Sequence, residues 1–435
     1  MTSSEAPTTS PYGAPAAKYG ENVAPSPVDA PVSVRQDAAI ATGPLLSAPA
    51  TRRGSLLTLG IIGVSVLAVV SLGVTGYLLL GLGPVAFGIG GILALVPLAI
   101  VLVGVHWIDR WEPEPRLVLV FAFLWGAAAS VAIALIVGAQ IDNAVNTLGG
   151  PGPAYQFFGA AIQAPIVEEA GKGLGLLLIF LFARKHFDGP IDGLVYAAWI
   201  AGGFAFTENI LYFGAELLNS GGSIGAVTSI FFMRGIMSPF AHVMFTAATG
   251  LLLGIAARRA STAGGVGFFF IGLVPAILLH ALWNGALFFV GDFFFGYYAL
   301  VQFPLFVGAV LLVVFLRKKE AKLTHDRLSE YAAVGWYNPD EINALATGAG
   351  RRQAMAWARA RGVAPAMRKY THDSTRLAFT RQRLITGRAN IGAEADEAAL
   401  LASIVATRAS LHASTPVAAP PVQYAPPAPP APPVQ

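Results

Sequence analysis

Cysteine is absent from the 435-residue chain, which excludes disulfides, thiolate metal ligands and cysteine nucleophiles. Charged residues are scarce at 12%, against roughly 25% in soluble domains. Together with 55% hydrophobic residues and a mean hydropathy of +0.62, this composition indicates a membrane protein. We expect no cleavable signal peptide, because the first apolar run begins about 54 residues into the chain and is longer than a signal core.

Eight apolar runs of about 20–30 residues are each long enough to cross a bilayer. They cover roughly residues 55–81, 84–106, 117–139, 157–183, 191–217, 227–256, 265–290 and 297–316. The sequence therefore predicts an all-α, polytopic bundle of about eight transmembrane helices.

Basic residues occupy every second connection between these runs. They are Arg52 and Arg53, Arg110 and Arg116, Arg184 and Lys185, Arg258 and Arg259, and Arg317, Lys318 and Lys319. The alternate connections, near 82–83, 140–156, 218–226 and 291–296, contain no Lys or Arg. This positive-inside pattern predicts a multi-pass protein of the cell membrane with both termini in the cytoplasm.

Composition predicts four segments. Residues 1–51 form a disordered Pro/Ala-rich segment, 52–319 the transmembrane domain, 320–412 a basic helical cytoplasmic tail, and 413–435 a Pro-rich disordered tail.

The cytoplasmic tail is predicted to be helical after Asn338, with Asn as cap and Pro339 at the first helical position. From Arg317 onward it has 16 Lys and Arg against 9 Asp and Glu. Such a surface could contact anionic lipid headgroups or a nucleic acid. We interpret it as a solvated helical tail and expect no nucleic acid partner.

The fourth apolar run contains Glu168, Glu169 and Lys172. Ionisable groups at this depth are costly and suggest function. Glu168 and Lys172 share a helix face and can pair, whereas Glu169 points about a quarter-turn away.

Three later runs also contain polar residues. They are Glu208 with Asn209, Arg234 with His242, and His280 with Asn284. Counting from the outer ends at 1.5 Å per residue places Glu168, Glu208, His242 and His280 in one narrow slab. Three pairs lie four residues apart and should share a helix face: Phe204 with Glu208, Ser238 with His242, and His280 with Asn284. We expect these groups to line a common, hydrated cavity.

The chemistry of these groups suits water activation. A buried glutamate can act as a general base, a histidine can hold water or protonate a leaving amine, and an Asn amide can donate to an oxyanion. Glu168, Glu208, His242 and His280 are also a suitable donor set for Zn²⁺. The residues do not decide between directly activated water and metal-bound water. They also leave two roles open for Arg234: a contact to substrate, or a partner for Glu208 or Glu216.

Common protease motifs are missing. The chain has no H-E-x-x-H, and Asp292 falls in a short outer connection. Gly221 to Gly225 matches G-x-S-x-G but lies in a Gly/Ser-rich connection without the strand–turn–helix context.

Across about residues 55–316 the sequence resembles the PrsW family of intramembrane proteases, relatives of the CAAX-prenyl and bacteriocin-processing membrane proteases. The resemblance rests on Glu168-Glu169-x-x-Lys172, Phe204-x-x-x-Glu208, His242, His280-x-x-x-Asn284 and the segment from Asp109 to Pro115.

The resemblance implies cleavage of membrane-anchored proteins, in some bacteria an anti-sigma factor. It implies that Glu168 or Glu169 activates water and that Glu208 and His242 complete the centre. His280 and Asn284 would bind water and stabilise the oxyanion. The residues alone leave two alternatives: a proton-coupled transporter, since buried Glu, Lys and His also form proton relays, or a scaffold whose polar groups only join helices.

Overall fold

The computed structural model describes residues 52–147, 153–187, 189–259, 261–386 and 393–413. Within these ranges the regular secondary structure is entirely helical. This confirms the predicted all-α membrane fold. The predicted disordered segment 1–51 and residues 414–435 of the predicted Pro-rich tail lie outside the described residues.

Helix α1 (Arg52–Asp109) contains the first two predicted spans in one continuous element. It bends at Gly83, whose φ of 73° lies in the left-handed region. Pro84 follows and cannot donate a backbone hydrogen bond, so the helix changes direction there.

The later membrane elements follow in chain order. They are α2 (Arg116–Leu124), the π-helical turn η1 (Trp125–Ser130), α3 (Val131–Thr147), α4 (Pro153–Phe158), η2 (Gly159–Gln163), α5 (Ala164–Phe182), η3 (Arg184–His186), α6 (Pro190–Asn219), α7 (Ile224–Phe231), η4 (Phe232–Met237), α8 (Ala241–Arg259), α9 (Thr262–Val290), η5 (Gly291–Phe293), α10 (Phe294–Tyr297), η6 (Tyr298–Gln302) and α11 (Phe303–Ala333).

Five helical stretches among the described residues are long and apolar enough to cross a membrane. They are Thr58–Asp109, Arg116–Thr147, Pro190–Asn219, Ile224–Arg259 and Ala263–Ala333. Some are long enough for more than one crossing, since 52 residues of helix extend about 78 Å against about 30 Å of hydrocarbon. The exact count of eight spans is not confirmed and stays a prediction.

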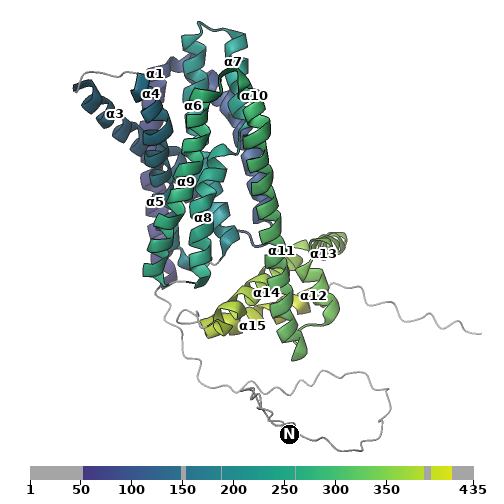
Figure 1. Ribbon diagram of the computed structural model, residues 1–435. Coiled ribbons are helices and arrows are strands. Elements are labelled where there is room, and N and C mark those ends of the chain that lie inside the picture. Colours follow the sequence, from purple (N-terminus) through teal and green to yellow (C-terminus); the bar gives the residue numbers. More distant parts are fainter. Residues whose placement is uncertain (1–51, 148–152, 188, 260, 387–392, 414–435) are drawn as a thin grey trace, which may run out of the picture. The chain divides into compact units, whose positions relative to one another are not determined.

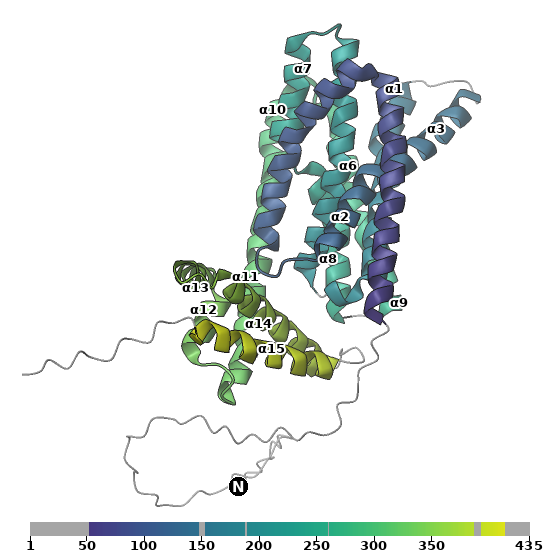
Figure 2. The ribbon, with the colours of Figure 1, turned by 180° about the vertical axis from the view of Figure 1, so that it is seen from behind.

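Helix α6 lies at the centre of the membrane part, and 78% of its most apolar window is buried. Figure 1 shows α6, α8 and α9 side by side, and Figure 2 shows α2 and α1 on the reverse side of α6. Two glycines allow α6 and α8 to touch: a Cβ on Gly193 would lie 1.9 Å from the Gly250 carbonyl oxygen. This contact sets the distance between two helices that carry site residues.

The tail begins within α11 and continues through α12 (Pro339–Ala346), α13 (Gly348–Ala360), α14 (Ala364–Ile385) and α15 (Ala393–Ala413). The predicted helix start at Asn338 is confirmed, with Asn338 and Glu341 forming a capping box. These helices bury an apolar core of their own that includes Leu328, Leu377 and Ile404. Because α11 runs without a break past residue 319, the predicted domain limits stay predictions.

The tail contacts the connection that follows α1. The Arg351 guanidinium lies 3.4 Å above the Trp111 ring and donates to its carbonyl oxygen at 2.7 Å. Beside this contact, residues including Glu112, Glu114, His372 and Arg376 line a polar cavity of about 190 Å³. Burial lowers the pKa of His372, and the nearby Arg376 charge lowers that pKa further. The segment Asp109 to Pro115 therefore lies against the tail rather than near the intramembrane carboxylates.

We expect Gly193→Ala to destabilise the protein by about 1–3 kcal/mol, because the added methyl group would force α6 and α8 apart. Gly88→Ala on α1 is the matched control: its Cβ would meet open space, so it should leave stability unchanged or slightly raised. Thermal unfolding in detergent measures both changes. Equal melting temperatures for the two variants would contradict the close contact.

Candidate active site

Helix α5 brings two carboxylates to one amine. Lys172 is fully buried, and its Nζ donates to Glu169 Oε1 at 2.7 Å and to Glu168 Oε2 at 3.4 Å. The sequence predicts Glu168 as the partner of Lys172. The structure adds Glu169 as the nearer one, because positions i and i+3 are also neighbours on a helix.

The two glutamates differ in their surroundings. Glu169 has no exposed side-chain surface, and its oxygens are held by three groups: the Lys172 amine, the His280 Nδ1 at 3.1 Å and the Thr246 hydroxyl, which donates at 2.8 Å. Glu168 is 12% exposed and lies 3.9 Å from His280 Nε2. Glu169 is thus fixed on all sides, whereas Glu168 keeps a partly open carboxylate.

Glu208 on α6 forms the second half of the cluster. Its Oε2 lies 2.9 Å from His242 Nε2 and pairs with the Arg234 guanidinium. Arg234 Nε also donates to Asn209 Oδ1 at 3.2 Å. Arg234 is therefore a partner of Glu208, one of the alternatives that the sequence leaves open.

One contact joins the two halves. Lys172 Nζ lies 3.2 Å from His242 Nδ1, so α5 and α8 meet through the same amine that holds both α5 carboxylates. Phe204 closes one side, with its ring 4.1 Å from Lys172 Nζ. The residues of four separate helices thereby form one connected network.

Two members of this site were not predicted from the sequence. Thr246 lies four residues after His242 on the same face of α8, a spacing that would have pointed to it. Phe245 stacks on His280 with ring centroids 4.7 Å apart, which only the packing of α8 against α9 reveals.

The predicted pairing of Ser238 with His242 on one helix face is wrong. Helix α8 begins at Ala241, and Ser238 is the residue that follows η4, with a non-helical φ of −130°. Pro239 disfavours the helical conformation of the residue before it, so the apolar run 227–256 breaks at this point.

Asn284 lies at the edge of the cluster. Its amide donates to the Ala160 carbonyl oxygen in η2 at 3.2 Å. It also lines a cavity of about 40 Å³, large enough for a water molecule. The other lining residues are Ala205, Asn209, Arg234, Ser238, Pro239, Ala241, His242, Phe245 and Trp283.

Three π-helical turns adjoin the site. Trp125 at the start of η1 donates to the Gly171 carbonyl oxygen of α5 at 2.9 Å, η2 accepts from Asn284, and η4 contains Arg234. A π-helical turn changes the register of the helix around it, and such turns are frequent at functional sites. Here they redirect side chains that regular helices would aim elsewhere.

A metal ion fits the donor set. Glu168, His242 and His280 each offer a ligand atom within 4.8 Å of the others. Two imidazoles and a carboxylate with an open position are typical of catalytic zinc. His242 Nε2 faces Glu208 and His280 Nδ1 faces Glu169, as is usual behind metal-bound histidines. The nitrogen of His242 that remains for a metal is Nδ1, which lies 3.2 Å from Lys172 Nζ, so the amine would have to shift as the ion binds. The predicted fourth ligand, Glu208, lies outside this triad and is engaged by Arg234.

The charge balance of the cluster is also compatible with a bound cation. Three carboxylates face two cationic side chains, Lys172 and Arg234, which leaves a formal charge of −1 with neutral histidines. An unbalanced charge in an apolar setting is costly, so the cluster favours one more proton or a cation.

The family model described as "PrsW family intramembrane metalloprotease" matches residues 114–309. Protease PrsW of Clostridioides difficile is 30% identical over 196 residues, which cover 44% of this chain and 76% of the relative. The chain belongs to the PrsW family. Protease PrsW of Bacillus subtilis is 28% identical over 176 residues, which cover 40% of this chain and 72% of that relative. Protease PrsW of Shouchella clausii is 27% identical over 234 residues, which cover 53% of this chain and 96% of that relative. No solved structure matches.

Membership of the PrsW family confirms the predicted function: the chain is an intramembrane endopeptidase. The transporter and scaffold alternatives are not favoured. The family description includes a metal, which agrees with the donor triad, and a protease of this family acts on a protein substrate in a membrane.

We expect Lys172→Met to destabilise the protein by about 3–5 kcal/mol, because it leaves buried carboxylates without their cation. Adding Glu169→Gln should restore part of that loss, since it removes one of the orphaned charges. Unfolding in detergent of both single variants and the double variant measures the coupling. Simple additivity of the two losses would show that Lys172 and Glu169 do not pair.

Proposed function

We propose that Glu168 is the base that activates water for peptide hydrolysis. The connected cluster of carboxylates and imidazoles inside apolar helices carries this proposal. Glu168 is the partly open carboxylate of the α5 pair, and His280 Nε2 lies 3.9 Å from it. A water between them would give its proton to Glu168 as its oxygen bonds to the carbonyl carbon of the substrate.

Glu169 is then a positioning residue. Its contacts to Lys172, His280 and Thr246 fix the ring plane of His280 and the position of the amine. A carboxylate enclosed in this way supports a neighbouring imidazole without meeting the substrate.

His242 is proposed to protonate the leaving amine, with Glu208 holding its ring. Arg234 and Asn284 line the small cavity beside His242, where their N–H groups would face the developing oxyanion. Departure of the amine after protonation breaks the C–N bond, and transfer of the proton from Glu168 to His242 restores both groups and completes the hydrolysis.

The alternative scheme is metal-assisted: Glu168, His242 and His280 would hold the ion and would then serve as ligands, not as base and acid. When bound, a divalent cation would act there as a Lewis acid on the peptide carbonyl. Lys172 would meanwhile hold Glu169 in place behind His280.

The proposed setting is a multi-pass protein of the cell membrane with both termini in the cytoplasm, as the alternating basic connections indicate. The substrate would be a membrane-anchored protein cut toward the outer side, in regulated proteolysis of the anti-sigma-factor type that the family resemblance implies.

Replacing Glu168 with Gln should lower kcat by about 10²–10⁴-fold, because the amide cannot accept a proton from water. Glu216→Gln, on α6 away from the cluster, is the matched control and should keep full activity. Cleavage of membrane proteins that accumulate uncut in a deletion strain, reconstituted in liposomes, gives the rates.

Thermal unfolding of both variants must resemble that of the wild type for the comparison to hold. Undiminished cleavage by a folded Glu168→Gln protein would overturn the assignment of the base.

The metal scheme predicts that the purified protein contains about one divalent cation per chain, and that His280→Ala loses it while Glu216→Gln retains it. Elemental analysis by mass spectrometry measures this content. Chelation should abolish cleavage and Zn²⁺ should restore it. Full activity after complete metal removal would exclude the metal from the reaction.

A further inference from the structure

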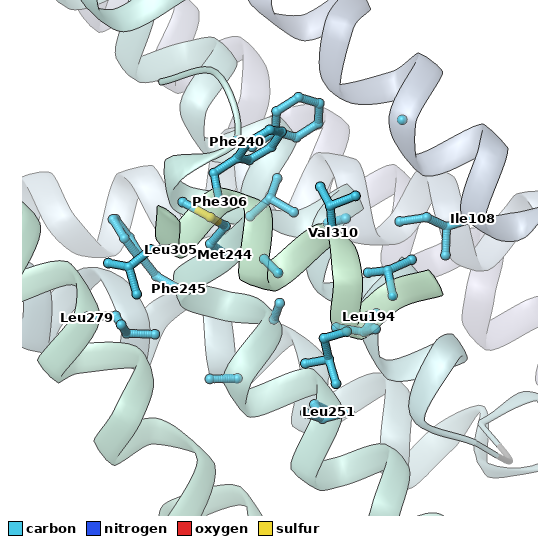
Figure 3. A pocket seen from close by; sticks show the side chains of 18 of the residues that line it. Ile108, Leu194, Phe240, Met244, Phe245, Leu251, Leu279, Leu305, Phe306 and Val310 are labelled. Carbon is cyan, nitrogen blue, oxygen red and sulfur yellow. The ribbon is translucent and has the colours of Figure 1, made fainter. Parts of the chain in front are cut away.

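A second, larger cavity of about 410 Å³ opens beside the cluster. Helices α1, α6, α8, α9, α10 and α11 supply its walls, with apolar side chains throughout. Figure 3 shows several of them around the cavity, among them Ile108, Leu194, Phe240, Leu251, Phe306 and Val310. None of the described residues that line it is charged, so it suits an apolar occupant.

Helix α8 separates this cavity from the catalytic groups. His242 and Thr246 point to the cluster, while Val243, Ala247 and Leu251 line the cavity from the other half of the helix. From Phe240 to Leu251 the lining follows α8 for about 16 Å. The cavity is thus an elongated channel along the helix.

The channel reaches the site at one place. Phe245 and Trp283 line both the apolar cavity and the small polar cavity that contains His242 and Asn284. Their rings meet edge to face, with centroids 5.6 Å apart. These two aromatic rings form the only wall shared by both cavities among the described residues.

We infer that this channel binds an unwound apolar segment of the substrate next to the bond that is cut. The inference rests on the proposed proteolysis. A helical peptide hydrogen-bonds its own carbonyls, so the scissile bond must leave the helix before water can attack it. At about 3.3 Å per residue, a channel of about 16 Å accepts roughly five extended residues.

The shared wall with the polar cavity selects this occupant. A lipid chain would fit the apolar walls equally well, but it has no need of a channel that borders the cavity of His242. A substrate segment in the channel would pass Phe245 and Trp283, and the peptide bond beside these rings would be the one nearest His242. Large apolar residues on that side of the bond should therefore be preferred.

Filling the channel tests the inference. The probe is a pool of single-span reporter proteins in liposomes, with five consecutive membrane positions varied among Ala, Leu and Phe. In Ala248→Phe and Ala309→Phe, kcat/KM for Leu- and Phe-containing reporters should fall at least about tenfold, and Ala-containing reporters should change little. Ala68→Phe, on the exposed face of α1, is the matched control and should keep the wild-type preference. Unchanged preferences in both filled variants would overturn the inference.

A second readout is independent of cleavage. Because the chain has no cysteine, Leu305→Cys at the channel rim can be tested for disulfide capture of reporters that carry one cysteine in the varied segment. Capture at Leu305, and not at Ala68→Cys, supports the channel. If the wild type cuts no reporter, capture still supports the channel while the proposed hydrolysis fails. Absence of capture, as expected for a channel filled by lipid, overturns the assignment.

Discussion

The buried amine of Lys172 is the interaction on which the site depends. It joins both α5 carboxylates to His242 on α8, and Glu169 extends the network to His280 on α9. Burying an ion costs several kcal/mol unless its partners are well placed. The helices must therefore approach closely enough to satisfy every charge, and small residues such as Gly193 and Gly250 make that approach possible.

This constraint also separates the roles of groups that look alike. Glu169 is enclosed by three partners, whereas Glu168 keeps a partly open carboxylate, which is why the proposed base is Glu168 and the proposed positioning residue Glu169. Helix α8 divides the space further, with polar groups on one half and an apolar channel on the other. A peptide that meets both would lie with its apolar segment in the channel and its scissile bond beside His242.

Local patterns and the shared depth of Glu168, Glu208, His242 and His280 were predictable from the sequence, whereas the individual pairings between distant segments were not. The i, i+4 spacing of Glu168 and Lys172 and the cap at Asn338 depend on neighbouring residues, and both are present in the structure. Which helices meet depends on packing, so Thr246 and Phe245 were missed. The presence of Pro239 could have predicted a break in the helix, but the apolar run on both sides of it indicated one continuous span. Only the packed helices show that Glu208 pairs with Arg234 and that Glu168, His242 and His280 form the candidate metal triad without it.

The most direct test of this account is whether α5 and α9 meet at the cluster within a membrane. The natural chain lacks cysteine, so thiols introduced together by Glu168→Cys and His280→Cys can be joined by a short thiol-reactive cross-linker in native membranes. The account predicts efficient cross-linking of this pair and none when Glu216→Cys replaces Glu168→Cys. Equal cross-linking of both pairs, or none in a folded protein, would contradict the shared intramembrane site.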